Sequence, residues 1–263
     1  MFYEEHEQRI IEQFLATGYV IFPLESEQRI ECIREKIFSL TLPDGVDLAQ
    51  ESIREYLEYF HRVRPDIDLN AFRLTLIEGM AADSGLRADI YWTASKHLHW
   101  LVGNELAMQR ACNLSIQQPG DESAILPLHT DVWSGNSPYE VVLWLPLVDC
   151  YRTKSMFLLP RGKSLQVCAE AEIFRDMSAE QLYRRVENDL IWLDVPFGHG
   201  VLFWHGLLHG NRVNCENETR WTINVRFKSL LSPYGTKEIG ESFLPITPRP
   251  LTRIGYAYRE PVI

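Results

Sequence analysis

The chain lacks any long uncharged apolar run, and its first residues are acidic rather than an apolar signal segment. A helix that spans a bilayer needs about 20 consecutive apolar residues. Export and membrane spanning are therefore not expected, and a cytoplasmic location is. Cysteine is also scarce: five residues, an odd number, stand far apart with no C-x-x-C pair. They are expected to be reduced thiols and not a disulfide framework.

Positive charge is in deficit as well. Lys and Arg number 26 against 36 Asp and Glu, which gives a net charge of −10. Binding to a nucleic-acid backbone usually needs a basic surface that displaces counterions. No nucleic-acid partner is therefore expected. The 263 residues are 46% hydrophobic, enough to bury a full core, and the length suits one domain acting on a small-molecule substrate.

The first part of the chain, residues 1–107, has mostly helical patterning. Ser26 is a candidate N-cap for a helix over residues 27–40, because its hydroxyl can accept a bond from a free backbone N–H of the first turn. A second amphipathic stretch runs from 49 to 63. These helices are expected to pack against a sheet.

The remainder predicts a fold that is mainly β with N-terminal helices (α+β), in a single domain over 1–263. Short β-rich runs alternate with Gly and Pro turns over 108–231, which is typical of a jelly roll, or double-stranded β-helix. Residues 170–189 have helical spacing and predict an insertion. The proline-rich residues 232–263 predict an irregular extended arm, which would either cover the mouth of a site or join two copies as a homodimer.

His129 and Asp131 are two residues apart at the end of a run that is predicted to be a strand or a strand end. Alternate residues of a strand point to the same face, so both side chains can reach one metal ion. A third ligand must come from elsewhere. His209 ends an apolar run broken by glycine and is the best candidate, with His205 as its rival. Two histidines and one carboxylate on one face of an octahedron are typical of non-haem Fe(II) oxygenases.

Arg220 follows eleven residues after His209, on a segment whose polar and bulky residues alternate as in a strand. An inward guanidinium beside a metal needs an anionic partner. Its planar fork suits a carboxylate, such as the distal carboxylate of 2-oxoglutarate, while the other end of that co-substrate chelates the iron.

Four blocks of the sequence carry a family likeness. They are G-Y-V at 18–20 after an opening helix, Q-P-G at 118–120 before H-T-D at 129–131, the runs at 141–149 and 156–163, and H-G-N at 209–211 with Asn214 and Arg220. In these blocks the chain resembles the phytanoyl-CoA dioxygenase-like family of Fe(II)/2-oxoglutarate-dependent oxygenases, and within it the members from carbohydrate and antibiotic biosynthetic clusters. The family interval between the distal histidine and the arginine is about eleven residues, which favours His209 over His205.

The resemblance implies an enzyme that uses Fe(II), 2-oxoglutarate and O2 to oxidise a C–H bond of a small polar metabolite. Hydroxylation is the expected outcome, with desaturation, cyclisation or epimerisation as alternatives. It also implies that Gln117 and Trp144 line the co-substrate pocket, although each is equally explained as a core residue. His205 would then be a neighbour of the metal site or a substrate residue.

Two further sets of residues bear on the substrate. The loop after the metal pair carries Trp133, Asn136 and Tyr139, whose aromatic, amide and hydroxyl groups suit a polar ring such as a sugar. Where the chain departs from the family pattern, four basic residues flank a connecting loop and are candidates to meet a substrate phosphate or carboxylate, unless they are simply solvated: Arg152, Lys154, Arg161 and Lys163.

Two other classes of protein fit parts of this pattern. A non-redox jelly-roll metalloenzyme, such as an isomerase or epimerase with zinc or manganese, needs the same histidines but not Arg220. A catalytically silent binding protein of the same fold is expected to have lost a ligand, and this chain keeps all three.

Overall fold

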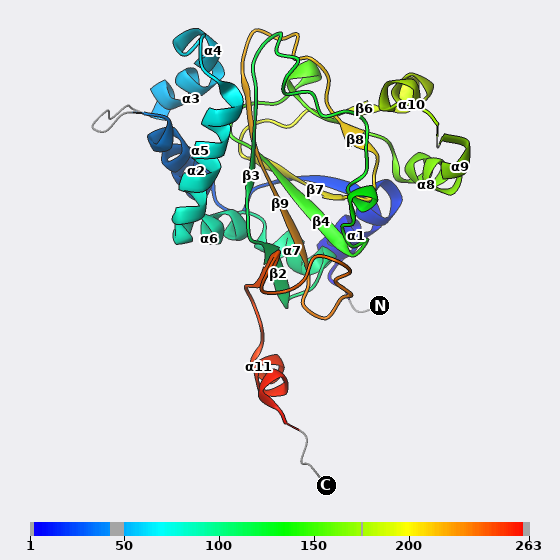
Figure 1. Cartoon of the computed structure of the whole chain (residues 1–263). Coiled ribbons are helices and arrows are strands. Elements are labelled where there is room, and N and C mark those ends of the chain that lie inside the picture. The colour runs from blue at the N-terminus through cyan, green and yellow to red at the C-terminus, as the bar shows by residue number, and fades with distance from the viewer. Residues whose placement is uncertain (1–2, 43–49, 175, 260–263) are drawn as a thin grey trace.

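The computed structural model describes residues 3–42, 50–174 and 176–259. Helices and antiparallel strands are mixed in the chain (Figure 1). The helices are α1 Glu5–Thr17, α2 Glu27–Thr41, α3 Gln50–Glu58, α4 Phe60–Val63, α5 Leu69–Ala82, α6 Ser84–Trp92, α7 Ser95–Leu101, α8 Arg161–Ala169, α9 Ala171–Phe174, α10 Ala179–Val186 and α11 Pro250–Ala257. The strands are β1 Tyr19–Pro23, β2 Leu106–Gln109, β3 Asn113–Gln117, β4 Glu140–Pro146, β5 Phe157–Leu158, β6 Ile191–Trp192, β7 His199–Trp204, β8 His209–Gly210, β9 Arg220–Ser229 and β10 Phe243–Pro245.

The predicted N-terminal helices are confirmed. Ser26 caps α2, because its hydroxyl oxygen accepts a hydrogen bond from the backbone N–H of Arg29. The predicted helix over 49–63 is present as α3 and α4, and Ala49 lies outside the described residues. Helices α2 to α6 gather on one side of the large sheet, as Figure 1 shows.

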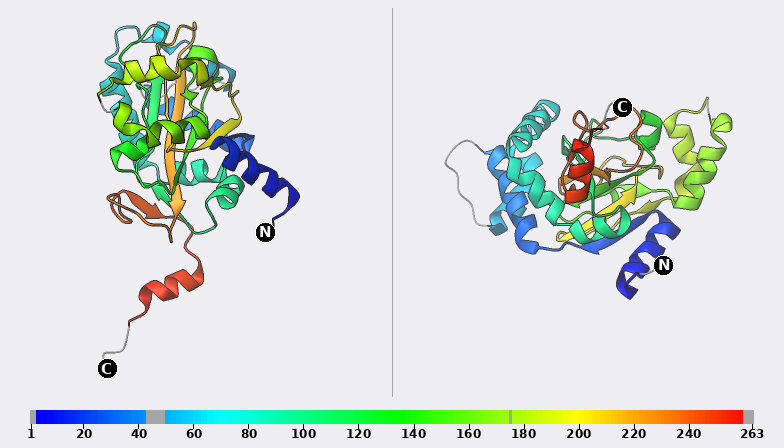
Figure 2. Two further views of the ribbon diagram at one scale, coloured as in Figure 1. Left: turned by 90° about the vertical axis from the view of Figure 1, so that its right-hand side faces the viewer. Right: turned by 90° about the horizontal axis from the view of Figure 1, so that it is seen from below.

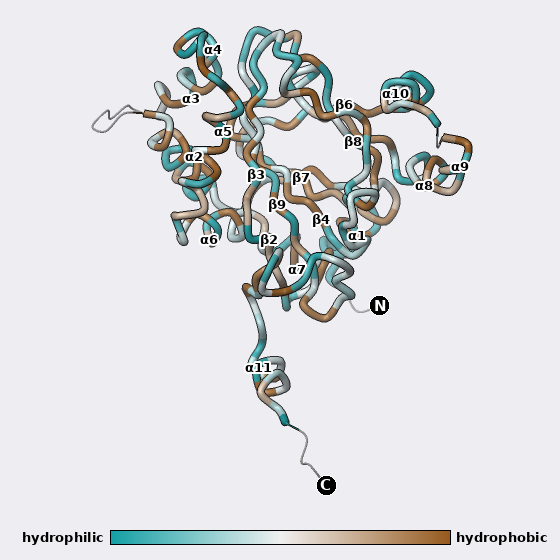
Figure 3. Tube along the Cα trace, viewed as in Figure 1, coloured by the Kyte–Doolittle hydropathy of each residue, from teal (hydrophilic) through white to brown (hydrophobic). Residues whose placement is uncertain are grey.

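The large sheet has seven strands in the order β1-β7-β4-β9-β2-β10, and β3 also pairs with β9. Side chains alternate between the two faces of such a sheet. One face of β9 is apolar, carries Trp221 and Ile223, and belongs to the main hydrophobic core with residues of the helices. The opposite face carries Arg220, Asn224 and Arg226. Figure 3 shows hydrophobic residues gathered on β4 and β7.

A smaller sheet has the order β6-β5-β8. A second hydrophobic cluster joins the two sheets, with Trp144 and Phe203 from the large sheet and Leu158 from the small one. The two sheets therefore face one another across a shared core, and β8 brings His209 to the rim of that core.

Several expectations need correction. Helix outweighs strand, 44% to 21%, so the chain is a mixed α and β protein and not mainly β. The helical insertion comprises α8 to α10 and begins at Arg161 instead of 170. The tail is not irregular throughout: it forms β10 and α11, where Pro250 sits at the start of a helix, a position that needs no N–H donor. Figure 2 shows α11 extending away from the body. None of the described helices is long and apolar enough to span a membrane.

Candidate metal centre

His129 and His209 are brought together by their own backbones. The N–H of each donates to the carbonyl of the other, at 3.0 and 2.8 Å, and forms an isolated antiparallel bridge. Residues 124–129 were predicted to be a strand or a strand end. The strand is wrong, because only the last residue, His129, has β pairing, in this one bridge. The two imidazole rings lie with centroids 4.3 Å apart.

The residues that follow His209 clamp the segment before His129. Asn211 receives a hydrogen bond from the backbone N–H of Leu126 and donates one from its amide to the carbonyl of Ala124. Gly210 allows the close approach, because a Cβ there would stand 2.6 Å from the carbonyl oxygen of Leu126. Residues 209–211 therefore fix the position of His129 relative to His209.

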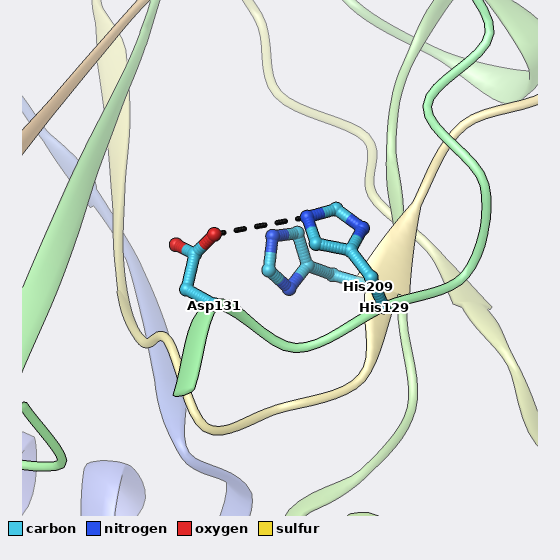
Figure 4. A group of neighbouring side chains, drawn as sticks. All are labelled: His129, Asp131 and His209. Carbon is cyan, nitrogen blue, oxygen red and sulfur yellow. Dashed lines mark ion pairs between the residues drawn. The ribbon is translucent and has the colours of Figure 1, made fainter. Parts of the chain in front are cut away.

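Asp131 completes a set of three possible ligands at the start of a short 3₁₀ turn, Asp131–Ser134. Its backbone N–H donates to the carbonyl of His205. One ligand atom from each of His129, Asp131 and His209 lies within 4.8 Å of the others, and Figure 4 shows the three side chains converging. The Nε2 of His129 is 3.7 Å from Oδ1 of Asp131.

Both imidazoles are oriented for metal binding. Nδ1 of His129 is 2.8 Å from the carbonyl of Pro127, and Nδ1 of His209 is 2.9 Å from the carbonyl of Leu207. A carbonyl only accepts, so each Nδ1 carries the proton and each Nε2 keeps its lone pair. Burial, and then the neighbouring His129, lower the pKa of His209 to about 4, which favours the neutral ligand form.

Arg226 holds the carboxylate ligand from behind. Its Nη2 and Nε donate to Oδ2 of Asp131, at 2.7 and 3.2 Å, and leave Oδ1 on the side of His129. Burial opposes ionisation of Asp131, but His129, His209 and Arg226 together hold the pKa of this carboxyl well below its usual range. Arg226 was not among the residues predicted from the sequence, although its even spacing from Arg220 along the strand places both side chains on one face.

A cavity of about 320 Å³ opens beside these ligands and reaches Arg220. Arg220 is 3% exposed, and its Nη1 and Nη2 donate to the carbonyl of Ser155 and to the hydroxyl of Ser115. Its Nε has no partner, and no carboxylate in the described part of the chain pairs with it. Burial lowers the pKa of Arg220 to about 10, so it remains charged at neutral pH. A buried guanidinium without a counterion calls for an anionic ligand.

Of the other residues expected at the site, one lines the cavity and two do not. Trp144 lines the cavity from β4. Gln117 is fully buried beside Arg220 in the strand register, but its amide donates to the carbonyl of Arg212 and it does not line the cavity. His205 is also fully buried. Its Nε2 lies 2.6 Å from the carbonyl of Ser137, so it stands behind Asp131, outside the ligand set and the cavity lining.

The loop after the metal pair does not reach the cavity. Trp133 and Tyr139 are more than half exposed to solvent, and Asn136 is buried with its amide on the carbonyl of Asp131. The structure does not bring these three residues into the lining.

The four basic residues at the connecting loop also lie outside the cavity lining. Lys154 is fully buried and pairs with Glu218. Lys163 pairs with Asp189 on the surface, and Arg161 donates to a backbone carbonyl. The expectation that this loop meets a substrate anion is therefore corrected, since none of its basic residues lines the cavity.

No protein-family model matches the chain, and no curated protein matches it in sequence. Solved structures do match. The non-haem α-ketoglutarate-dependent carbocyclase SnoK from nogalamycin biosynthesis is 15% identical, with a TM-score of 0.55 over 93% of this chain and 97% of that one. HygX from Streptomyces hygroscopicus, with nickel and 2-oxoglutarate bound, is 16% identical, with a TM-score of 0.51 over 96% and 94%. The nickel complex of the non-haem monooxygenase ThoJ is 14% identical, with a TM-score of 0.52 over 90% and 83%. The chain therefore has the fold of these non-haem enzymes.

Proposed function

We propose that this chain is a non-haem Fe(II)- and 2-oxoglutarate-dependent oxygenase of the phytanoyl-CoA dioxygenase-like family. The observation that carries the proposal is the joint geometry of the site. Two neutral imidazoles and a carboxylate converge beside a cavity that ends on a buried, unpaired arginine. The residues fit the groups that the resemblance implies, because His129, Asp131 and His209 offer an iron(II) face and Arg220 offers the anion contact.

In this proposal each residue has a separate task. His129, Asp131 and His209 hold iron, and their fixed orientation leaves the cavity side open. Arg220 binds the distal carboxylate of 2-oxoglutarate, with Trp144 beside it as part of the cavity wall. When bound, the iron and 2-oxoglutarate supply the oxidation of a substrate C–H bond by O2.

The fold type, the reaction and the substrate class are further parts of the proposal. We infer that the two facing sheets belong to a jelly roll within one domain over 1–263, since SnoK and HygX align over nearly the whole chain.

Hydroxylation of a small polar metabolite is the proposed reaction. A carbocyclase among the solved structures with this fold keeps cyclisation as the main alternative. A sugar or an antibiotic intermediate is the proposed substrate class, in a cytoplasmic enzyme whose C-terminal arm joins two copies as a homodimer.

One anaerobic measurement tests the cofactor assignment. Purified protein is mixed with Fe(II) and 2-oxoglutarate, and the visible metal-to-ligand charge-transfer band of the complex is recorded. The band is expected for the native chain and for His6→Ala, which changes an exposed histidine on α1. It is expected to disappear in His209→Ala. A folded native protein that gives no band would overturn the proposal.

A further inference from the structure

The cavity contains polar groups besides the three candidate metal ligands and Arg220. Asn113 on β3 and Asn224 on β9 are directly opposite in the strand register, and both line the cavity. Trp144 is opposite Asn224 on its other side. Within the described residues neither of the two carboxamide side chains has a hydrogen-bond partner. Each offers two donors and an acceptor, so the pair can bind a ligand that carries hydroxyl groups.

Arg73 extends this wall from helix α5. It is half-buried, lines the same cavity, and its Nη2 donates to the side-chain oxygen of Asn70, one turn earlier, at 2.8 Å. No carboxylate in the described ranges pairs with it. Six other described arginines do contact a carboxylate: Arg29, Arg34, Arg54, Arg184, Arg212 and Arg226. Arg73 instead leaves its positive charge without a carboxylate partner at the edge of the cavity.

The charges in the cavity do not balance without a further anion. Its charged lining residues are Arg73, Asp131, Arg220 and Arg226. Asp131 offsets Arg226, to which it is bonded. Iron(II) and 2-oxoglutarate carry equal and opposite charge, so their binding leaves the excess unchanged. The cavity would remain positive in a chain whose net charge is −10, an arrangement that attracts an anion to this one place.

We propose that the primary substrate carries a carboxylate or phosphate group that Arg73 binds, while its hydroxyl-bearing part contacts Asn113 and Asn224. This inference rests on the proposed function and specifies that the substrate is an anion. Asn70 orients the guanidinium for the anion. The anion contact comes from helix α5, not from the basic loop around Lys154, because none of the basic residues of that loop lines the cavity.

The test uses the protein loaded anaerobically with Fe(II) and 2-oxoglutarate, and three probes: glucose, glucuronate and glucose 6-phosphate. Titration calorimetry measures the binding of each. At least one charged sugar is expected to bind about 10- to 100-fold more tightly than glucose, as one charge-assisted contact allows. Preference for glucose 6-phosphate identifies a phosphate as the substrate group, and preference for glucuronate identifies a carboxylate.

Arg73→Gln is expected to remove that preference, and Arg73→Lys to retain part of it. Arg64→Gln is the matched control, because Arg64 lies over the Phe72 ring near α5 and outside the cavity. The charge-transfer band is expected to persist in all three variants. Equal binding of charged and neutral sugars, or an unchanged preference in Arg73→Gln, overturns the inference while the band still stands. Loss of the band in the native protein overturns the proposed function instead.

Discussion

The two faces of β9 differ in almost every physical respect. Arg220, Asn224 and Arg226 face the cavity, whereas Trp221 and Phe227, on the other face, are fully buried against the helical side. Stability and chemistry therefore reside on opposite sides of one strand. Substitutions on the apolar face should cost folding free energy with little direct effect on ligands. Those on the cavity face should change metal or anion binding in a protein that still folds.

The largest effect is expected for the carboxylate ligand. Asp131→Ala should abolish O2-dependent succinate formation from 2-oxoglutarate, because the metal loses its anionic ligand and Arg226 loses its partner. Circular dichroism should show a folded protein. Asp189→Ala, at a surface ion pair far along the chain, is the matched control and should form succinate as the native chain does. Near-normal succinate formation by Asp131→Ala would contradict the metal assignment.

On the opposite face the largest expected change is in stability. Trp221 is fully buried, packs edge-on against Phe60, and donates its indole N–H to the carbonyl of Leu57. Trp221→Ala should lower the free energy of unfolding by about 3–5 kcal/mol through lost contacts and a cavity. Urea unfolding measures this. The fraction that remains folded should still give the charge-transfer band, and a stable protein that lacks the band would break the separation of the two faces.

Sequence patterns carried much of this architecture. The Ser26 cap, the helices after it and the alternation along β9 follow from local rules that need no knowledge of the rest of the chain. The segment before His129 could not be predicted in this way. It resembles a strand in composition, but its position is fixed by the Asn211 side chain and one backbone bridge from a distant part of the sequence.

The cavity also contains residues that local sequence patterns could not predict. The three candidate ligands and Arg220 were found from spacing and resemblance. Arg73 was not, because it lies on a helix about sixty residues before the metal pair, and only the packing of α5 on β3 brings it to the cavity. Conversely, Trp133 and Tyr139 are near Asp131 in sequence, yet the turn after Asp131 directs them to solvent. Proximity in sequence is therefore a weak guide to a cavity lined by several elements.

At Arg220, the effect of a substitution on 2-oxoglutarate binding should be separable from its effect on the free energy of unfolding. Arg220→Gln should weaken 2-oxoglutarate binding by about 100-fold, since two charge-assisted hydrogen bonds are lost. Its effect on unfolding should be small or even favourable, because the native chain buries this charge without a counterion. The apparent KM for 2-oxoglutarate in uncoupled turnover and the urea midpoint are the two measurements. Unchanged KM would remove Arg220 from the co-substrate site.

A smaller effect is expected at the residue behind the ligand. Arg226→Gln should weaken metal affinity by about 10- to 100-fold, which is usual when a partner of a metal ligand is lost. Its Nη2 and Nε both hold Oδ2 of Asp131. Equilibrium titration with Ni(II) or Co(II) measures the change. Arg226→Lys should recover part of the loss, which a general disturbance of the strand would not allow.

The smallest effect is expected for a buried histidine on the apolar side of the sheet. His97 lies on the apolar side, stacked on Phe22 with ring centroids 4.0 Å apart, and burial lowers its pKa from 6.5 to about 4. Below pH 6.5 the unfolded chain gains a proton at this position that the folded chain does not, so stability falls as the pH drops from 6.5 towards 4. At pH 5 the loss from His97 should be about 1–2 kcal/mol. Urea unfolding at pH 7 and pH 5 measures the change. The free energy of unfolding should fall by about 1–2 kcal/mol less in His97→Phe than in the native chain. An equal pH dependence in the variant and the native chain would show that His97 is not the group responsible.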